Sequence, residues 1–211
     1  MLTRCGDDSF SLTVASPRDA QSLASALRPR SDWLEVVPGI DSVFLRFDAT
    51  RHTGDEVRRL IEMAIEQSIE PLPTADDLIE IPVVYGGAFG PDIDELAEKT
   101  GLSVDDIIGL HTGSEFSVDM VGFTPGFAFI GGLDERLSVP RRGEPRQRVE
   151  AGSIGIADGR TGIYAMASPG GWALIGRTPA RLFDPGAEQP FVLEPGMRIR
   201  FRSIGPDEFD R

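Results

Sequence analysis

The spacing of apolar residues predicts strands and a helix near the start of the chain. Apolar and polar residues alternate along Ser9–Ala15, which predicts a strand, and a helix with proline at its start is expected over 17–27. Strands over 33–37 and 42–48 are joined by Pro38-Gly-Ile-Asp41, whose residue types are typical of a turn. These two strands therefore form a predicted hairpin.

The clearest helical pattern follows this hairpin. From Thr53 or Asp55, either of which can cap the helix, apolar residues recur at the i, i+3, i+4 and i+7 positions with Glu and Arg opposite. The resulting order is β-α-β-β-α, and Leu78–Tyr85 is available as a closing strand. This order predicts a small ferredoxin-like α/β domain over residues 1–77.

Glycine usage changes near residue 80. Residues 1–81 contain three of the 24 glycines, and residues 82–211 contain the other 21. The segment Pro71–Asp77 has the composition of a linker. We therefore expect a second domain of different architecture over residues 78–211.

The second domain is predicted to be rich in β-structure. Two short acidic helices are expected first, over Asp92–Lys99 and Val104–Leu110, and Ser103 with Asp106 forms a capping box for the second. Short strands separated by Gly and Pro then predict a barrel or a sandwich. The predicted strands are 116–123, 153–157, 162–167, 172–175 and 197–201.

Composition excludes several kinds of chemistry. Of the 21 Lys and Arg residues only Lys99 is a lysine, and it stands in Glu-Lys-Thr, so the sequence has no nucleotide-binding P-loop. One cysteine, Cys5, and two histidines exclude an intrachain disulfide, a multi-cysteine zinc site and a three-histidine metal site. We expect a cytoplasmic protein, because these residues suit a reducing compartment and no apolar run approaches the roughly 18 residues of a membrane helix.

The net charge of −13 argues against a nucleic-acid partner, yet the charge is uneven along the chain. Between Val139 and Arg181 seven arginines stand against three acidic residues, a local charge of 7 − 3 = +4, so the remainder carries −17. A small anionic molecule is therefore expected to bind in this stretch. Its arginines are Arg141, Arg142, Arg146, Arg148, Arg160, Arg177 and Arg181.

Four loop segments are candidate ligand contacts, and two of them are Ser168-Pro-Gly-Gly-Trp172 and Arg177-Thr-Pro179. The run from Gly122 to Gly132 combines glycines, the Thr124 hydroxyl and three phenylalanines, so it can wall a pocket or, alternatively, pack a barrel corner. Asp158-Gly159 predicts a hairpin turn, after which Arg160 and Thr161 can reach an anionic oxygen.

His111 closes the second acidic helix. It is either a cation that interacts with the helix dipole or the acid–base group of a site. The sequence lacks the Gly-x-Ser-x-Gly motif that would support a Ser-His-Asp triad. The acidic residues of 92–106 are best explained as a solvated helix surface.

A series of motifs over most of the chain resembles the family of 5-oxoprolinase B subunits, also called allophanate hydrolase subunit 1 or KipI-like. The motifs are Gly6-Asp-Asp8, Val37-Pro-Gly-Ile-Asp-Ser-Val43, Ile81-Pro-Val-Val-Tyr-Gly-Gly87, Gly90-Pro-Asp92, Leu110-His-Thr112, Gly122-Phe-Thr-Pro-Gly-Phe127, Gly131-Gly-Leu133, Pro140-Arg141, Gly152-Ser-Ile-Gly-Ile156, Thr161-Gly-Ile-Tyr164, Ser168-Pro-Gly-Gly-Trp172, Ile175-Gly-Arg-Thr-Pro179 and Leu182-Phe-Asp184.

The resemblance implies an α+β protein, with a cyclophilin-like β-barrel behind the small N-terminal domain. It further implies one component, inactive alone, of an ATP-dependent enzyme that opens 5-oxo-L-proline to L-glutamate. The implied partners are a homologous C subunit and a third hydrolase subunit, and ATP is used by the complex without a P-loop in this chain. Relatives suggest two alternatives, an inhibitor of a histidine kinase and a carboxyltransferase component of urea carboxylase. The second needs biotin, and Lys99 lacks the flanking methionines of a biotin attachment site.

The sequence departs from the family pattern at two candidate contacts. Gly126-Phe-Ala-Phe129 stands where the family usually has Gly-Phe-Pro-Tyr, and Arg160 stands where it usually has Gln. The expected catalytic residues are His111, Arg160 and Arg177. The expected substrate-binding residues are Phe123, Thr124, Gly126, Phe127, Arg141, Ser153, Thr161, Tyr164, Ser168 and Trp172.

Overall fold

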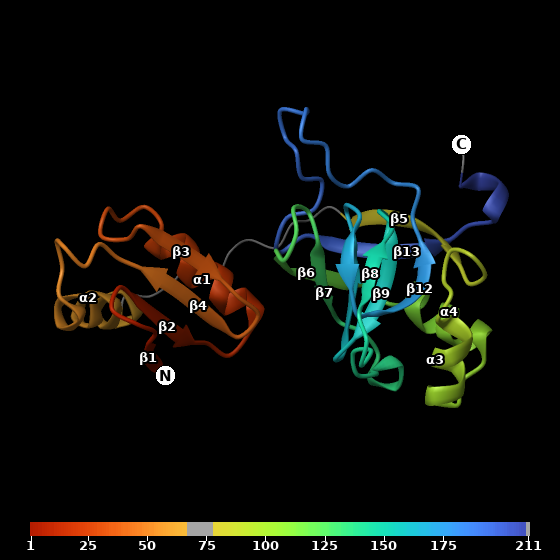
Figure 1. Cartoon of the computed structure of the whole chain (residues 1–211), viewed down its shortest axis with the longest axis horizontal. Helices are drawn as coiled ribbons and strands as arrows, with labels where there is room; N and C mark the ends of the chain where they lie inside the picture. The colour runs from red at the N-terminus through yellow and green to blue at the C-terminus, as the bar shows by residue number, and fades with distance from the viewer. Residues whose placement is uncertain (67–77, 210–211) are drawn as a thin grey trace. The chain divides into compact units, whose positions relative to one another are not determined.

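The structure is a computed structural model that describes residues 1–66 and 78–209 (Figure 1). Contacts divide the chain into two compact units, Met1–Pro73 and Thr74–Arg211. The predicted linker at Pro71–Asp77 lies outside the described residues, as does the predicted boundary at residue 77. Each unit has its own hydrophobic core.

Unit 1 is a four-stranded antiparallel sheet with two helices. The strand order is β1-β2-β4-β3, and the predicted sequence β-α-β-β-α is present from β2 onward. The elements are β1 (Leu2–Arg4), β2 (Ser9–Thr13), α1 (Pro17–Leu27), β3 (Glu35–Pro38), β4 (Ser42–Arg46) and α2 (Gly54–Glu66).

Local signals account for both helices. The Ser16 side chain caps α1 by accepting a hydrogen bond from the Asp19 N–H at 3.1 Å, and proline follows at the first helical position. At α2, Thr53 and Glu56 bond to each other's backbone N–H, as in a capping box. The helices cover one face of the sheet, where alternate strand residues such as Phe10 and Leu45 are buried.

The prediction that Leu78–Tyr85 closes this sheet is wrong. The edge position beside β2 is taken by β1, with Leu2 opposite Leu12, although the sequence of β1 gives little strand signal. Leu78–Tyr85 is instead β5 of unit 2, because Ile81 and Val83 bury their side chains in the core of that unit.

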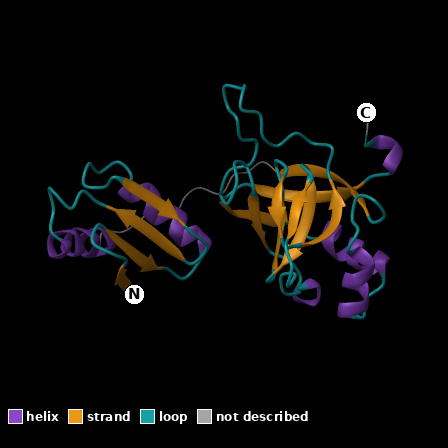
Figure 2. Ribbon diagram, viewed as in Figure 1, coloured by secondary structure: helices purple, strands orange, loops and turns teal. Residues whose placement is uncertain are grey.

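Unit 2 contains a closed seven-stranded barrel, drawn in orange in Figure 2, which confirms the predicted β-barrel. The order around the barrel is β10-β7-β6-β13-β5-β12-β9, and β5 with β13 is the parallel pair. The barrel strands are β5 (Leu78–Tyr85), β6 (Phe116–Val121), β7 (Ala128–Gly131), β9 (Ser153–Ala157), β10 (Arg160–Ile163), β12 (Ala173–Arg177) and β13 (Arg198–Ser203). Kinship with cyclophilin-like barrels and, for unit 1, with ferredoxin-like folds stays a prediction.

The remaining elements of unit 2 surround the barrel. Strands β8 (Arg146–Val149) and β11 (Ser168–Gly170) pair with each other outside it, and neither was predicted, because each is short and polar or Pro/Gly-rich. The two acidic helices form as predicted, α3 at Ile93–Thr100 and α4 at Val104–Gly113, with the Ser103/Asp106 capping box in place. Two short 3-10 helices occupy Glu135–Leu137 and Pro206–Glu208.

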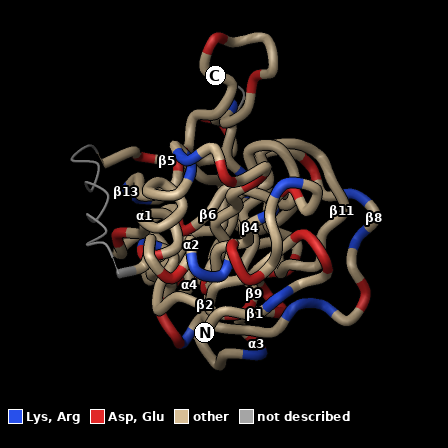
Figure 3. The backbone as a smooth tube through the Cα atoms, turned by 90° about the vertical axis from the view of Figure 1, so that its left-hand side faces the viewer, with Lys and Arg blue, Asp and Glu red and all other residues tan. Residues whose placement is uncertain are grey.

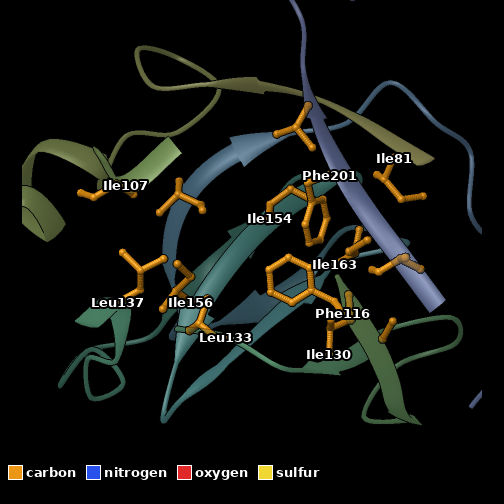
Figure 4. Packing of buried hydrophobic residues seen from close by; sticks show 14 of the residues in the cluster. Ile81, Ile107, Phe116, Ile130, Leu133, Leu137, Ile154, Ile156, Ile163 and Phe201 are labelled. Atoms are coloured by element: carbon orange, nitrogen blue, oxygen red, sulfur yellow. The ribbon is translucent and has the colours of Figure 1, made fainter. Parts of the chain in front are cut away.

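Side chains alternate between the inside and the outside of the barrel. Figure 4 shows the interior, where Ile154 of β9 lies opposite Ile163 of β10, and the rings of Phe116 and Phe201 meet edge to face at 5.3 Å. None of the helices in the described residues is long and apolar enough to span a bilayer.

A second hydrophobic cluster lies on the outer face of the barrel. Its buried members are Phe127, Val149, Ala157, Tyr164, Trp172 and Leu174, and Phe129 packs against them. Outward positions Gly155 and Gly162 on β9 and β10 make room for it, because a Cβ there would lie 2.8 and 2.9 Å from Trp172. The missing side chains let the indole lie directly on the strand backbone.

One buried carboxylate ties this outer layer to the barrel. Asp92, which is 4% exposed, accepts hydrogen bonds from Arg146 at 2.6 Å, Arg142 at 3.2 Å and the Leu174 N–H at 2.7 Å. The Asp92 N–H in turn donates to the Leu174 carbonyl at 2.9 Å. The start of α3, strand β12 and the segment before β8 therefore converge on a single side chain.

We predict that Asp92→Asn destabilises unit 2. The substitution removes the negative charge between two guanidinium groups, and loss of one partner from a largely buried ion pair should lower the free energy of unfolding by about 2 kcal/mol. Urea denaturation of the full chain measures this change. Asp94→Asn is the matched control on the exposed side of the same helix turn, and an equal effect of the two variants would contradict the role given to Asp92.

Candidate ligand pocket on the outer face of the barrel

A cavity of about 280 Å³ opens over the outer hydrophobic cluster. It is formed where the run after β6, the segment before β8 and the loop between β11 and β12 meet. Most of its wall is apolar, with one guanidinium and one phenol hydroxyl among the lining side chains. The lining residues are Phe123, Phe127, Phe129, Arg141, Pro145, Tyr164, Pro169, Gly170, Gly171 and Trp172.

Phe127 is the centre of the aromatic wall. Its ring makes edge-to-face contacts with Phe129 at 4.7 Å, Tyr164 at 4.8 Å and Trp172 at 5.5 Å between centroids. Such pairs prefer this geometry and fix one another's orientation. The pocket is therefore preorganised to hold a flat ring against aromatic surfaces.

Arg141 supplies the positive charge of the pocket. Its guanidinium lies 6.0 Å from the centre of the Trp172 ring, and its Nε donates to Asp158 at 2.9 Å. Asp158 and Gly159 form the predicted turn between β9 and β10, and both have positive φ, as a type I′ turn requires. The turn thus sets a carboxylate beside the pocket.

Tyr164 brings a hydroxyl to the pocket. Burial is the larger influence and raises the pKa of Tyr164, although the backbone N–H of Trp172 donates to the hydroxyl, so the phenol retains its proton at neutral pH. The hydroxyl oxygen accepts this hydrogen bond, and its O–H remains available to donate a second one. A ligand oxygen in the pocket is a suitable acceptor.

Phe123 stands at the mouth of the pocket in an unusual conformation. It has φ of +68° and is 67% exposed, while its ring contacts Phe127 at 5.7 Å. A non-glycine residue in the left-handed region costs roughly 1 kcal/mol, and an exposed aromatic side chain gains little from folding. Strain of this kind is concentrated at ligand-binding loops.

Four expected substrate-binding residues lie near the pocket without lining it. Gly126 packs against Ala165 and Phe183, and the Thr124 hydroxyl is buried without a partner among the described residues. Ser153 is buried in β9, and Ser168 is buried in β11 with its hydroxyl bonded to the Pro169 carbonyl. These residues support the loops that form the wall.

The structure places His111 and Thr161 inside the barrel. His111 is fully buried, and its Nδ1 lies 2.7 Å from the Tyr85 hydroxyl while its Nε2 lies 3.0 Å from Thr161 Oγ1. Thr161 Oγ1 donates to the Gly155 carbonyl, so it accepts from Nε2–H and Nδ1 accepts from Tyr85. This neutral ring joins α4 to β5 and β10, and it is stacked on Phe201 at 4.2 Å.

The prediction that His111 is a cation interacting with the helix dipole is wrong. Burial lowers the pKa of His111 to about 3, because the fully buried imidazole loses the hydration that stabilises its charged form. The imidazole is therefore neutral at physiological pH and does not line the pocket.

The two other expected catalytic residues lie outside the pocket lining. Arg160 Nε donates to Asp119 at 3.3 Å, and burial is the main influence that raises the pKa of Asp119. Arg177 donates to the Ala151 carbonyl at 2.8 Å and lies 5.5 Å from the centre of the Phe209 ring. Both guanidinium groups are held by partners within unit 2.

Most arginines of the basic stretch are paired with acids, and Figure 3 shows blue and red segments side by side near β8. The positive charge of these arginines is therefore largely neutralised by neighbouring carboxylates. The pairs are Arg141 with Asp158, Arg142 with Asp92 and Glu95, Arg146 with Asp92, Arg148 with Glu150, Arg160 with Asp119, and Arg181 with Asp184.

Several pocket residues are not among those expected from the sequence. Phe129 is noted in the sequence as a flat surface and as part of a departure from the family pattern, Pro169 lies within a quoted motif, and nothing in the sequence singles out Pro145. The signal that could have found Phe129 is its outward position on β7, two residues after Phe127. Asp158 is recognisable only as a turn residue, because its contact with Arg141 joins positions far apart in the sequence.

The fold and the site can be compared with known proteins. Residues 2–193 match the family model described as carboxyltransferase domain, subdomain C and D. The 5-oxoprolinase B subunit of Escherichia coli O157:H7 is 40% identical over 90% of this chain and 87% of its own length. The protein of the same name from Bacillus subtilis (strain 168) is 36% identical over 86% of this chain and 80% of its own. This chain belongs to the family of 5-oxoprolinase B subunits.

Solved structures agree on the fold. The protein solved as TTHA0988 superposes with a TM-score of 0.79 at 34% identity and covers 98% of this chain, which spans 41% of that longer chain. Urea carboxylase of Kluyveromyces lactis gives a TM-score of 0.80 at 17% identity over 99% of this chain and 22% of its own. At that identity the second match shows a shared fold alone.

We predict that His111 makes stability depend on pH. The unfolded chain binds a proton at this residue near pH 6.5, whereas the folded chain does so only near pH 3. The contribution of the neutral ring to the free energy of unfolding is complete above pH 6.5. It falls as the pH decreases, by about 1.4 kcal/mol per pH unit well below pH 6.5. His111→Gln should flatten the dependence of unfolding free energy on pH between 6.5 and 5.

The chain's other histidine provides the control. His52 lies in unit 1, and His52→Gln should leave the slope of unit 2 unchanged. The measurement is urea denaturation at several pH values in a Trp33→Phe background, followed by the fluorescence of Trp172 in unit 2. An identical slope for His111→Gln and the parent chain would contradict the neutral buried ring.

Proposed function

We propose that this chain is one subunit of an ATP-dependent 5-oxoprolinase that converts 5-oxo-L-proline to L-glutamate. It acts with a homologous C subunit and a third hydrolase subunit, and it is inactive alone. The observation that carries the proposal is the 40% identity to a 5-oxoprolinase B subunit over nearly the whole of both chains.

The candidate pocket supplies part of the substrate site in this proposal. 5-Oxo-L-proline is a small flat lactam with one carboxylate, and a cavity of about 280 Å³ walled by aromatic rings suits such a ring. Arg141 pairs with the carboxylate, and the Tyr164 hydroxyl donates to a lactam oxygen. The homologous partner covers the open side of the pocket, where Phe123 is exposed.

The candidate pocket does not fit ATP. A triphosphate needs several N–H donors together, and the pocket has one lining guanidinium amid largely apolar walls. The neighbouring Arg142 and Arg146 are already bonded to Asp92. We therefore assign nucleotide binding and phosphoryl transfer to the partner subunits and derive no such step in this chain.

The contribution of this chain is to bind and orient the lactam. Held between fixed aromatic faces with its carboxylate on Arg141, the ring presents its amide to the partner subunits in one orientation. Exclusion of water by the aromatic wall strengthens the charge pair. His111 acts at a distance from this site, because it holds the barrel interior beneath it.

Reconstitution tests the proposal directly. This chain mixed with the homologous partner and the third hydrolase subunit from the same source should hydrolyse ATP only when 5-oxo-L-proline is present, and should release L-glutamate. The chain alone should show neither reaction. L-Proline, which lacks the lactam, is the control substrate. A complete complex that forms but hydrolyses no ATP with 5-oxo-L-proline would exclude the proposed activity.

A pair of arginine variants tests the pocket. Arg141→Gln should raise the KM of the complex for 5-oxo-L-proline about tenfold or more, because it removes a charge-assisted hydrogen bond to the substrate carboxylate. Steady-state ATP hydrolysis measures the change. Arg148→Gln is the matched control, since Arg148 is an equally exposed arginine paired with Glu150 and does not line the pocket. Equal KM values for the two variants would remove Arg141 from the site.

A further inference from the structure

The turn between β9 and β10 brings a carboxylate to the guanidinium that lines the pocket. Asp158 has φ of +49°, and its N–H donates to the Val139 carbonyl at 2.8 Å. The turn is therefore fastened to the segment that leads into Arg141. In this position Asp158 Oδ2 accepts a hydrogen bond from Arg141 Nε at 2.9 Å.

This ion pair is exposed and uses only part of the guanidinium. The side chains of Arg141 and Asp158 are 61% and 55% exposed, and exposed pairs of this kind are weak. Beyond the Nε contact, the described residues offer the terminal N–H groups of Arg141 no acceptor. The guanidinium can therefore exchange Asp158 for another carboxylate without disturbing a buried group.

We propose that Asp158 is a specificity-determining residue that occupies Arg141 in the free chain and gives way to the carboxylate of a small cyclic ligand. The ligand ring then lies against Phe127 and Trp172, beneath the guanidinium. The choice of 5-oxo-L-proline as this ligand rests on the proposed function. The exchange itself rests on the geometry of the Asp158–Arg141 pair.

Charge competition has a distinct consequence for affinity. A bound carboxylate must break the Asp158 pair or tolerate a second negative charge beside it, so Asp158 weakens the binding of anionic rings. A neutral ring of the same shape meets no such competition. Arg146, the other cation that acts on Tyr164, is held by Asp92 and does not exchange.

The test is ligand titration of the full chain with one tryptophan. Trp33→Phe leaves Trp172, at the pocket wall, as the sole indole, and the indole N–H removed from position 33 has no partner in the part of the chain that the structure describes. Its fluorescence is followed with 5-oxo-L-proline and with 2-pyrrolidinone, the same lactam without a carboxylate. Asp158→Asn is then added, since Asn-Gly is well suited to this turn.

Asp158→Asn should lower the Kd for 5-oxo-L-proline by about two- to fivefold, the range expected for loss of an exposed ion pair. The Kd for 2-pyrrolidinone should not change. Glu150→Gln, which removes an equally exposed carboxylate from Arg148, should alter neither value. In an Arg141→Gln background the effect of Asp158→Asn should be smaller, and the difference between the two backgrounds measures the coupling of Asp158 to Arg141.

Several results would overturn the inference. An unchanged or raised Kd for 5-oxo-L-proline in Asp158→Asn would mean that Asp158 does not compete with the ligand. An equal effect on 2-pyrrolidinone would mean that the pocket shape had changed, and an undiminished effect in the Arg141→Gln background would mean that Asp158 does not act by occupying Arg141. Absence of binding of either lactam at millimolar concentration also rejects it, whereas ATP hydrolysis by the complete complex would still support the proposed function.

Discussion

The architecture of the pocket depends on one carboxylate. Asp92 stands at the start of α3, and its two oxygens hold Arg142, Arg146 and the backbone of Leu174. Each of these contacts belongs to a segment that forms pocket wall, because Arg141, Pro145 and Trp172 are their close neighbours in the chain. A charge buried at a helix start thereby fixes two segments, the stretch from Arg142 to Arg146 and the start of β12. Interactions of this kind tend to set specificity of arrangement more than net stability.

The aromatic layer is the second constraint, and it depends on residues that lack side chains. Gly155 and Gly162 leave two barrel strands flat on the outside, so that Trp172 and Phe127 pack on the backbone. The inside of the same strands is filled by isoleucines in the ordinary alternating pattern. The barrel thus carries a conventional core on its inner face and the wall of the candidate pocket on its outer face, from adjacent positions of the same strands.

Local signals made much of the fold predictable. Helix α1 has the predicted bounds, Pro17–Leu27, and the Asp158-Gly159 turn forms as predicted, because caps, proline and glycine act within a few residues. Strand β1 was missed because three residues at a sheet edge leave almost no pattern. For the candidate site, aromatic and arginine-containing motifs indicated loops that line the pocket. The neutral state of His111 was not predictable, since it depends on groups brought from distant strands.

The parallel pair of β5 and β13 has a consequence for synthesis of the chain. Leu78 pairs with Arg198, so the ribosome must make more than half of the protein between the two strands of one ladder. Unit 1, whose strands and helices are all near in sequence, can fold while translation continues. The apolar side chains of β5 must wait, exposed, until β13 emerges. Termination between β12 and β13 would therefore leave a folded first unit attached to an aggregation-prone open sheet.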